Sequence, residues 1–296
     1  MRKLGLSLSG GGVRGAAHIG VLKSLKKHGI HVDMISGTSA ASIVAALFAS
    51  GYSANEMESI FLEYQDNKFK RIQLLDVDIW HCIGLFYHLL HKSCPKLNGF
   101  LKGNALERKV RHLCEKKGIT KLRQAKIPIA IPAVDLRTSD ITMFVSRKSG
   151  LANKQYLVYY NNIDICEVVR ASSSLPIVFA PKYIGDMQLV DGGIRQNLPS
   201  EVLRDMGAEV VIGVDVGFYG QDMEDICGLT QIASRTLDIM TYQMAVQSAE
   251  LVDIMIYPNV FDVRILNFSK MQYCIDCGEK ETDKNIEKII RLIDKK

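Results

Sequence analysis

The chain lacks an apolar run long enough to cross a bilayer. Its most apolar stretch, residues 79–91, is well short of the roughly 20 residues that a transmembrane helix needs, so we interpret it as a buried or interfacial helix. The N-terminus also lacks the apolar core and the cleavage site of a secretory signal peptide. We therefore expect a cytoplasmic protein that can lie peripherally at a membrane.

Close-spaced metal ligands are scarce. The seven cysteines are an odd number, and only Cys274 and Cys277 stand close together, which favours reduced thiols over a disulfide framework. A lone C-x-x-C pair without a nearby histidine cannot complete a four-ligand zinc site. His81, His88 and His91 share one face of a helix, but no carboxylates alternate with them. We interpret these histidines as packing residues.

Long runs of one charge are absent as well. The 37 Lys and Arg residues against 32 Asp and Glu residues give a net charge of +5, without the basic arm typical of nucleic-acid binding. The mild basic bias suits phospholipid head groups, although an ordinary mixed surface explains it more simply. With 47% hydrophobic residues the composition is that of a globular protein, and no feature sets an oligomeric state.

Strands and helices alternate along most of the chain. A strand at residues 3–9 stops at glycines 10–12, and an amphipathic helix follows until Gly29. A second strand, at 32–36, precedes a helix that is apolar on nearly every side. Residues 209–216 form a continuous apolar strand, typical of a sheet that is covered on both faces. This order predicts an α/β protein with a mostly parallel central sheet.

Local signals add detail to this framework. Ser53 and Glu56 have the spacing of a capping box that begins a helix. Residues 127–134 read as a strand, although its prolines predict limited pairing. Residues 183–190 have the pattern of a hairpin with a Gly-Asp turn. Because no linker or repeat interrupts the chain, we expect a single three-layer α/β/α domain over residues 1–296, with a cap region at about 64–105.

Ser39 lies in a Gly-x-Ser-x-Ala segment between an apolar strand and a buried helix. This is the context of a nucleophile elbow, where small neighbours allow a tight turn that exposes the serine hydroxyl. Ala41 replaces the usual glycine with one extra methyl group. Ser39 would equally suit the role of an N-cap for the following helix, and the segment alone leaves both readings open.

A nucleophilic serine needs a base, and the order of residues limits the choice. The last histidine of the sequence is His112, so no histidine follows the later carboxylates as the Ser, Asp/Glu, His order of α/β-hydrolases requires. A carboxylate could act instead. Asp191 follows a short apolar strand and precedes two glycines, although an aspartate there is also a common turn residue.

The glycines at 10–12 lie between a strand and a helix. The N–H groups of Gly11 and Gly12 could stabilise a developing oxyanion, helped by the helix dipole and by Arg14. The same Gly-x-Gly-x-x-Gly pattern is also a dinucleotide fingerprint, with Asp33 as the ribose-binding acid. Against that alternative, the second strand continues past Asp33, and a triple glycine followed by arginine crowds a pyrophosphate.

Three motifs in order resemble the signatures of the patatin-like phospholipase family. They are Ser-Gly-Gly-Gly-Val-Arg-Gly at 9–15, Gly-Thr-Ser-Ala-Ala-Ser at 37–42 and Asp-Gly-Gly at 191–193. Segments 170–181 and 197–199 are similar too, so the resemblance covers about residues 3–217. It implies a three-layer α/β/α fold, a Ser-Asp dyad and no metal or cofactor. The implied site consists of Ser39 and Asp191 as the catalytic pair, Gly10, Gly11, Gly12 and Arg14 as the oxyanion loop, and Gly15, Gly37, Ala41, Gly192 and Gly193 as flanking residues.

The sequence therefore predicts a serine acyl hydrolase, either a lipid esterase or a phospholipase A or lysophospholipase type. Its partners would be acyl-ester lipids such as phospholipids, met in transient contact with a membrane surface. A catalytically silent lipid-binding or regulatory protein on the same fold is an alternative, although both dyad residues are present. A dinucleotide-binding oxidoreductase is the more distant one.

Overall fold

The computed structural model describes residues 2–76, 99–147, 157–160, 162–217 and 227–294. The expected apolar helix at 79–91, with its three histidines, lies outside the described residues. So does most of the expected cap region.

A single sheet organises the described part of the chain. Its strands follow the order β5-β4-β3-β2-β1-β8-β9, and β7 pairs with both β3 and β6. The strands are β1 Leu4–Leu8, β2 Met34–Gly37, β3 Ile129–Asp135, β4 Ile141–Val145, β5 Leu157–Tyr160, β6 Lys182–Ile184, β7 Met187–Asp191, β8 Val210–Val214 and β9 Ile254–Ile256. Five of the strand pairs are parallel and three are antiparallel. The expectation of a mostly parallel α/β sheet is confirmed.

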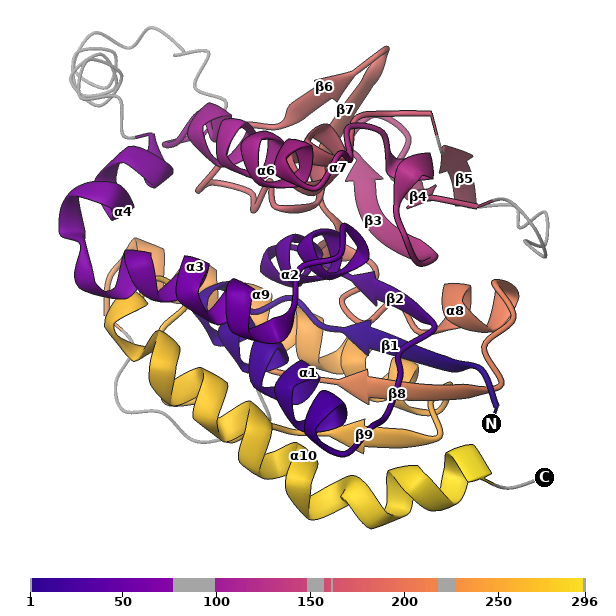
Figure 1. The fold of residues 1–296 in the computed structure, drawn as a ribbon. Coiled ribbons are helices and arrows are strands. Elements are labelled where there is room, and N and C mark those ends of the chain that lie inside the picture. The colour runs from indigo at the N-terminus through magenta and orange to yellow at the C-terminus, as the bar shows by residue number, and fades with distance from the viewer. Residues whose placement is uncertain (1, 77–98, 148–156, 161, 218–226, 295–296) are drawn as a thin grey trace, which may run out of the picture.

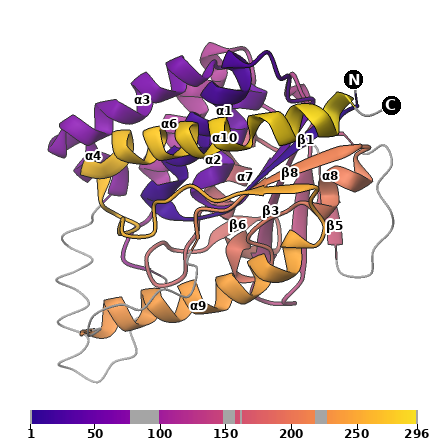
Figure 2. The same ribbon diagram turned by 90° about the horizontal axis from the view of Figure 1, so that it is seen from below.

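Helices cover both faces of this sheet (Figures 1 and 2). The helices are α1 Ala17–Lys27, α2 Ala40–Ala49, α3 Ala54–Asp66, α4 Lys68–Leu75, α6 Asn104–Lys116, α7 Ile165–Ser172, α8 Glu201–Asp205, α9 Leu229–Ala249 and α10 Met271–Asp294. Single 3-10 turns are η1 Gly12–Ala16, η2 Leu122–Gln124, η3 Gly192–Ile194 and η4 Phe268–Lys270. Figure 2 shows α1, α3 and α10 above the sheet and α8 and α9 below it.

Alternating side chains of the strands divide the core between these two faces. In β8, Val210 and Ile212 join the large cluster shared with α1, α2 and α10, whereas Val211 packs against Leu203 of α8. A Cβ on Gly5 of β1 would also meet α8. The continuous apolar pattern of β8 is therefore explained by burial on both faces, as predicted.

The local predictions are largely confirmed. The capping box of Ser53 and Glu56 begins α3 with both of its hydrogen bonds in place. β6 and β7 form the hairpin expected at 183–190. The limited pairing expected from the prolines is wrong for Pro132 on one side, because β3 pairs with β4 through that residue. On the opposite edge of β3 the expectation holds. There β2 and β7 pair with residues before and after Pro132, and neither strand pairs with Pro132 itself.

A very close helix contact joins α10 to α1, which follows the glycine loop. A Cβ on Gly20 would lie 1.9 Å from the Ile275 carbonyl oxygen, and one on Gly278 would lie 1.9 Å from that of Ala17. Both positions therefore require glycine. The two backbones can then pack directly against each other.

This contact predicts an unusual response to Gly278→Ala. Helix propensity alone would favour alanine by about 1 kcal/mol. The new methyl group would instead force α10 away from α1, and we expect a net loss of about 2 kcal/mol in the free energy of unfolding, measured by urea titration. Lys280→Ala, on the exposed side of α10, is the control. A Gly278→Ala protein as stable as the wild type would contradict the packing described above.

Candidate active site

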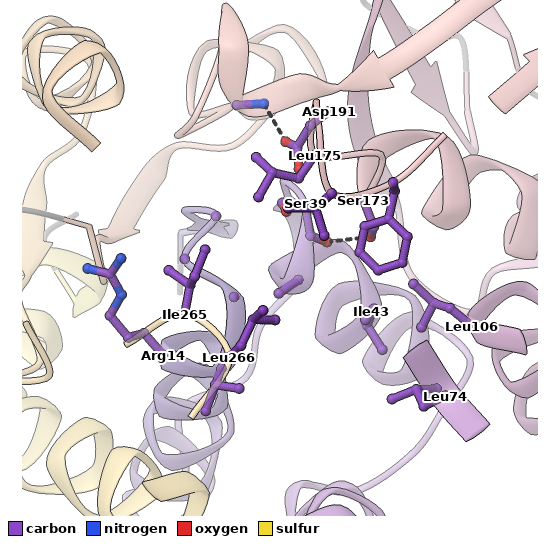
Figure 3. A pocket seen from close by; sticks show the side chains of 18 of the residues that line it. Arg14, Ser39, Ile43, Leu74, Leu106, Ser173, Leu175, Asp191, Ile265 and Leu266 are labelled. Carbon is purple, nitrogen blue, oxygen red and sulfur yellow. Dashed lines mark hydrogen bonds between the residues drawn. The ribbon is translucent and has the colours of Figure 1, made fainter. Parts of the chain in front are cut away.

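Ser39 and Asp191 meet because two strands end head to head beside β3. β2 pairs with Ile129 and Ala130 of β3 and then ends. β7 runs the opposite way along the far half of β3 and ends at Asp191, opposite Ala133. The loop after β2 and the end of β7 therefore face each other, and Figure 3 shows the two side chains next to each other.

Ser39 occupies a tight turn between β2 and α2, with the backbone geometry expected of a nucleophile elbow. Its φ of 55° and ψ of −129° lie in a region that is costly for any residue with a side chain. A Cβ on Gly37 would lie 2.7 Å from the Ala41 carbonyl oxygen, so the turn needs glycine there. Ala41 itself is fully buried in the first turn of α2. The side chain of Ser39 makes no capping hydrogen bond, so the N-cap reading has no support.

Asp191 presents a buried carboxyl to this serine. Its Oδ1 accepts from the Gly193 N–H at 2.8 Å, whereas Oδ2 is buried without a hydrogen-bond partner in the described part of the chain. Burial raises the pKa of Asp191 to about 6, and the Ser39 hydroxyl and the Gly193 N–H oppose that rise. The serine and the carboxyl are thus adjacent, although Oδ2 and the hydroxyl do not close a full hydrogen bond. Catalytic hydrogen bonds are often long before substrate binds.

The glycine loop that precedes η1 lies on the other side of Ser39. The Gly10 N–H is occupied, because it donates to Oδ1 of Asn197 at 3.0 Å. For Gly11 and Gly12, no acceptor pairs with the N–H within the described residues. These two groups lie at the N-terminus of a helical segment, where the backbone carries positive potential. They are the donors available to an oxyanion.

Arg14 lines the same cavity as Ser39 and Asp191, but its side chain does not face the serine (Figure 3). Its side chain is almost fully buried and turns away from Ser39 (Figure 3). It lies near Asp215 at the end of β8, where burial raises the pKa of the carboxyl and the charge of Arg14 lowers it. The guanidinium of Arg14 therefore lies toward Asp215 and does not face Ser39 (Figure 3).

Asp33 is badly placed for the ribose of a dinucleotide. β2 begins at Met34, so Asp33 lies before the strand and not at its far end. Its Oδ2 accepts from the Leu4 N–H at 2.8 Å, at the start of β1, whereas the glycine loop follows the end of β1. A strand of five residues, about 16 Å long, therefore separates the carboxyl from the glycines. This geometry argues against the dinucleotide alternative.

An apolar cavity of about 250 Å³ reaches Ser39 and Asp191. One side is built from Ile43 of α2 and Leu106 of α6, with Leu74 of α4 beyond them (Figure 3). This side continues inward to the buried residues Leu47, Val110 and Leu113. The opposite side is formed by Ile265 and Leu266, and Leu266 is about half exposed.

Within the described ranges, the protein offers neither a cluster of metal-ligating side chains nor a helix that could span a membrane. Among the described residues, no group of three or more His, Cys, Asp or Glu side chains is arranged to hold a metal ion. Cys274 and Cys277 lie on α10, where burial raises the pKa of Cys274 to about 12. No described helix is both long and apolar enough to cross a membrane.

Two residues at the site, Asn197 and Ile265, are not marked by any local sequence pattern. Asn197 belongs to a segment noted only for its family resemblance, yet its side chain holds the Gly10 N–H. Ile265, in the weakly similar C-terminal part, accepts from the Val13 N–H at 2.9 Å and lines the cavity. Neither residue has a local pattern that marks it, because each acts across a long sequence separation.

The chain is similar in sequence to known proteins. A family model described as "Patatin-like phospholipase" matches residues 6–204. The human protein named "Patatin-like phospholipase domain-containing protein 6" is 30% identical over 227 residues, which are 75% of this chain and 14% of that protein. "Lysophospholipase NTE1" of Scheffersomyces stipitis is 27% identical over 214 residues, or 72% of this chain and 12% of that protein. The chain thus spans about one seventh of the length of these relatives.

A solved structure supports the fold. The crystal structure of VipD from Legionella pneumophila aligns with a TM-score of 0.51 and 14% sequence identity. The alignment covers 97% of this chain and 67% of that one. At this identity the likeness concerns the fold alone, a central sheet flanked by helices.

The buried carboxyl predicts that Asp191→Asn changes stability in a pH-dependent way. Because the folded pKa, about 6, lies above the ordinary value of 3.8, Asp191 favours the fold most at low pH and loses that contribution as pH rises through 6. Relative to wild type, the Asn variant should gain about 2 kcal/mol in the free energy of unfolding between about pH 4.5 and pH 8. Urea titrations at both pH values measure this, with the exposed Asp186→Asn as control. A pH-independent difference would contradict a buried, ionising carboxyl.

Proposed function

Because the chain belongs to the patatin-like phospholipase family, we propose that it is a serine acyl hydrolase of lipid esters, with Ser39 as nucleophile and Asp191 as its base. The observation that carries this proposal is the buried Asp191 carboxyl beside the Ser39 hydroxyl, at an apolar cavity. A pKa of about 6 leaves the carboxyl ionised, yet still basic, near neutral pH.

The reaction follows from these positions. Asp191 takes the proton of the Ser39 hydroxyl as the oxygen attacks the ester carbonyl. The N–H groups of Gly11 and Gly12 stabilise the negative charge that develops on the carbonyl oxygen. Asp191 then returns the proton to the leaving alcohol, and an acyl group remains on Ser39. A water molecule, deprotonated by Asp191, releases the fatty acid and restores the serine.

The cavity favours a long acyl chain as the part of the substrate that enters the protein. The side between α2 and α6 is lined by apolar side chains and ends among fully enclosed ones. The side at Leu266 faces solvent and suits the polar leaving group. A phospholipid or lysophospholipid fits this division, and the similarity to proteins named phospholipase and lysophospholipase supports that substrate class.

We expect the protein to meet such a substrate at a lipid surface. Ile232, Ile239 and Val246 recur every seven residues on α9 and are each about half exposed, so they form one apolar stripe. Met240 of the same helix and Leu266 are also about half exposed, and both line the cavity. The exposed apolar side chains at the cavity, together with the stripe on the same helix, support transient contact with a membrane surface.

Labelling with a fluorophosphonate tests the dyad. We expect a covalent adduct on wild type and on Ser59→Ala, which lacks an exposed serine of α3, and none on Ser39→Ala. Asp191→Asn should lower p-nitrophenyl ester turnover about 100- to 10,000-fold by removing the base. Intact mass and peptide mapping locate the adduct. Folded wild-type protein without adduct or turnover would favour the silent lipid-binding alternative.

The acyl-chain assignment predicts a change in chain-length preference. Val110→Phe should fill the enclosed side of the cavity and lower kcat/KM for a palmitoyl ester about 10-fold or more, while a butyryl ester is hydrolysed nearly as before. Leu266→Phe, on the opposite wall, serves as the matched control and should leave the preference unchanged. If the Leu266 variant alone changed the preference, the chain would lie on that side instead.

A further inference from the structure

The C-terminal turn of α7, residues 172–174, contacts the backbones of both proposed catalytic residues. The hydroxyl of Ser172 accepts a hydrogen bond from the Ser39 N–H at 3.0 Å. The hydroxyl of Ser173 donates to the Ser39 carbonyl oxygen at 3.2 Å, a bond drawn in Figure 3. The carbonyl of Ser174 accepts from the Asp191 N–H at 3.0 Å. Three successive residues thus make two hydrogen bonds to the backbone of Ser39 and one to the backbone of Asp191.

The backbone of Ser39 needs such support. A residue with a φ of 55° is held in that conformation only when its surroundings fix it. Its carbonyl is also bonded by Ser42, through the N–H at 2.9 Å and the hydroxyl at 2.6 Å. Its N–H precedes the first residue of α2, and the acceptor that the structure gives it is the Ser172 hydroxyl. That hydroxyl belongs to another part of the chain.

The turn itself is firmly anchored. Arg170, almost fully buried in α7, donates to the hydroxyl of Ser174 and to the carbonyls of Lys102 and Ala180. Ser172 is completely buried. These contacts restrict movement of the turn. Its hydrogen bonds to Ser39 and Asp191 therefore limit how far either residue can shift.

We propose that the turn at residues 172–174 is a positioning device, which holds Ser39 and Asp191 at the separation that proton transfer requires. The inference rests on the proposed function, since it assigns positioning residues to the same dyad. Ser172 contributes most, because it is the partner of the Ser39 N–H. Loss of its hydroxyl would let the elbow relax and move the serine oxygen away from the carboxyl, and small displacements of reacting groups slow catalysis steeply.

A pair of serine variants tests this. Ser146 is buried like Ser172, and its hydroxyl likewise accepts from a backbone N–H, that of Ile129 at 3.0 Å, but it lies outside the proposed site. Ser172→Ala and Ser146→Ala should therefore lower the melting temperature by similar amounts. Ser172→Ala alone should lower kcat for a p-nitrophenyl ester about 10- to 100-fold with KM unchanged, and should slow fluorophosphonate labelling in parallel.

The outcomes separate this proposal from the function it rests on. An active wild type together with a folded Ser172→Ala protein of unchanged kcat would overturn the positioning role and leave the dyad intact. A wild type without turnover or labelling would overturn both. If Ser172→Ala does not fold, Ser173→Ala replaces it, since Ser42 still bonds the Ser39 carbonyl there. A smaller fall in kcat at constant KM then supports the proposal, and an unchanged kcat overturns it.

Discussion

The site depends on one constraint in the sheet, the replacement of β2 by β7 as the neighbour of β3. A parallel strand and an antiparallel strand share one side of β3, so their chain ends approach each other. Pro132 lies at the junction and has no N–H to leave unpaired there. Gly192 follows β7 where a Cβ would lie 2.5 Å from the Pro132 carbonyl oxygen. The order of the strands thus places Ser39 and Asp191 close together, independently of any side-chain contact.

The same junction places an ionisable carboxyl in the interior, and this has an energetic cost. Burial of Asp191 raises its pKa, so ionisation of this carboxyl at neutral pH costs folding free energy. Ser39 adds a backbone conformation that is itself unfavourable. The large cluster beneath α1, α2 and α10 offsets these costs, because most of the buried apolar side chains belong to it. Stability is therefore concentrated on one face of the sheet, and the strained turn lies where that face meets the cavity.

The parts of the site that are local in sequence could be predicted from it. The glycine loop, the elbow around Ser39 and the Asp-Gly-Gly segment each have a pattern of their own, and so do the capping box of α3 and the apolar β8. The direction of the Arg14 side chain could not be read, because it depends on Asp215, two hundred residues away. The ribose-binding role of Asp33 in the dinucleotide alternative depends on where the second strand begins, and β2 begins only at Met34, after Asp33. The roles of Ser172 and Asn197 required the tertiary contacts themselves.

The C-terminal part of the chain contacts the glycine loop, although the family match ends before it. The family match ends at residue 204, yet Ile265 accepts the Val13 N–H and leaves no room for a side chain on Gly12. Further on, α10 packs so closely against α1 that Gly20 can only be glycine. Ile265 meets Gly12, the last glycine of the loop, and η1 joins the loop to α1. The shape of the glycine loop is therefore constrained by Ile265, from the C-terminal part of the chain, as well.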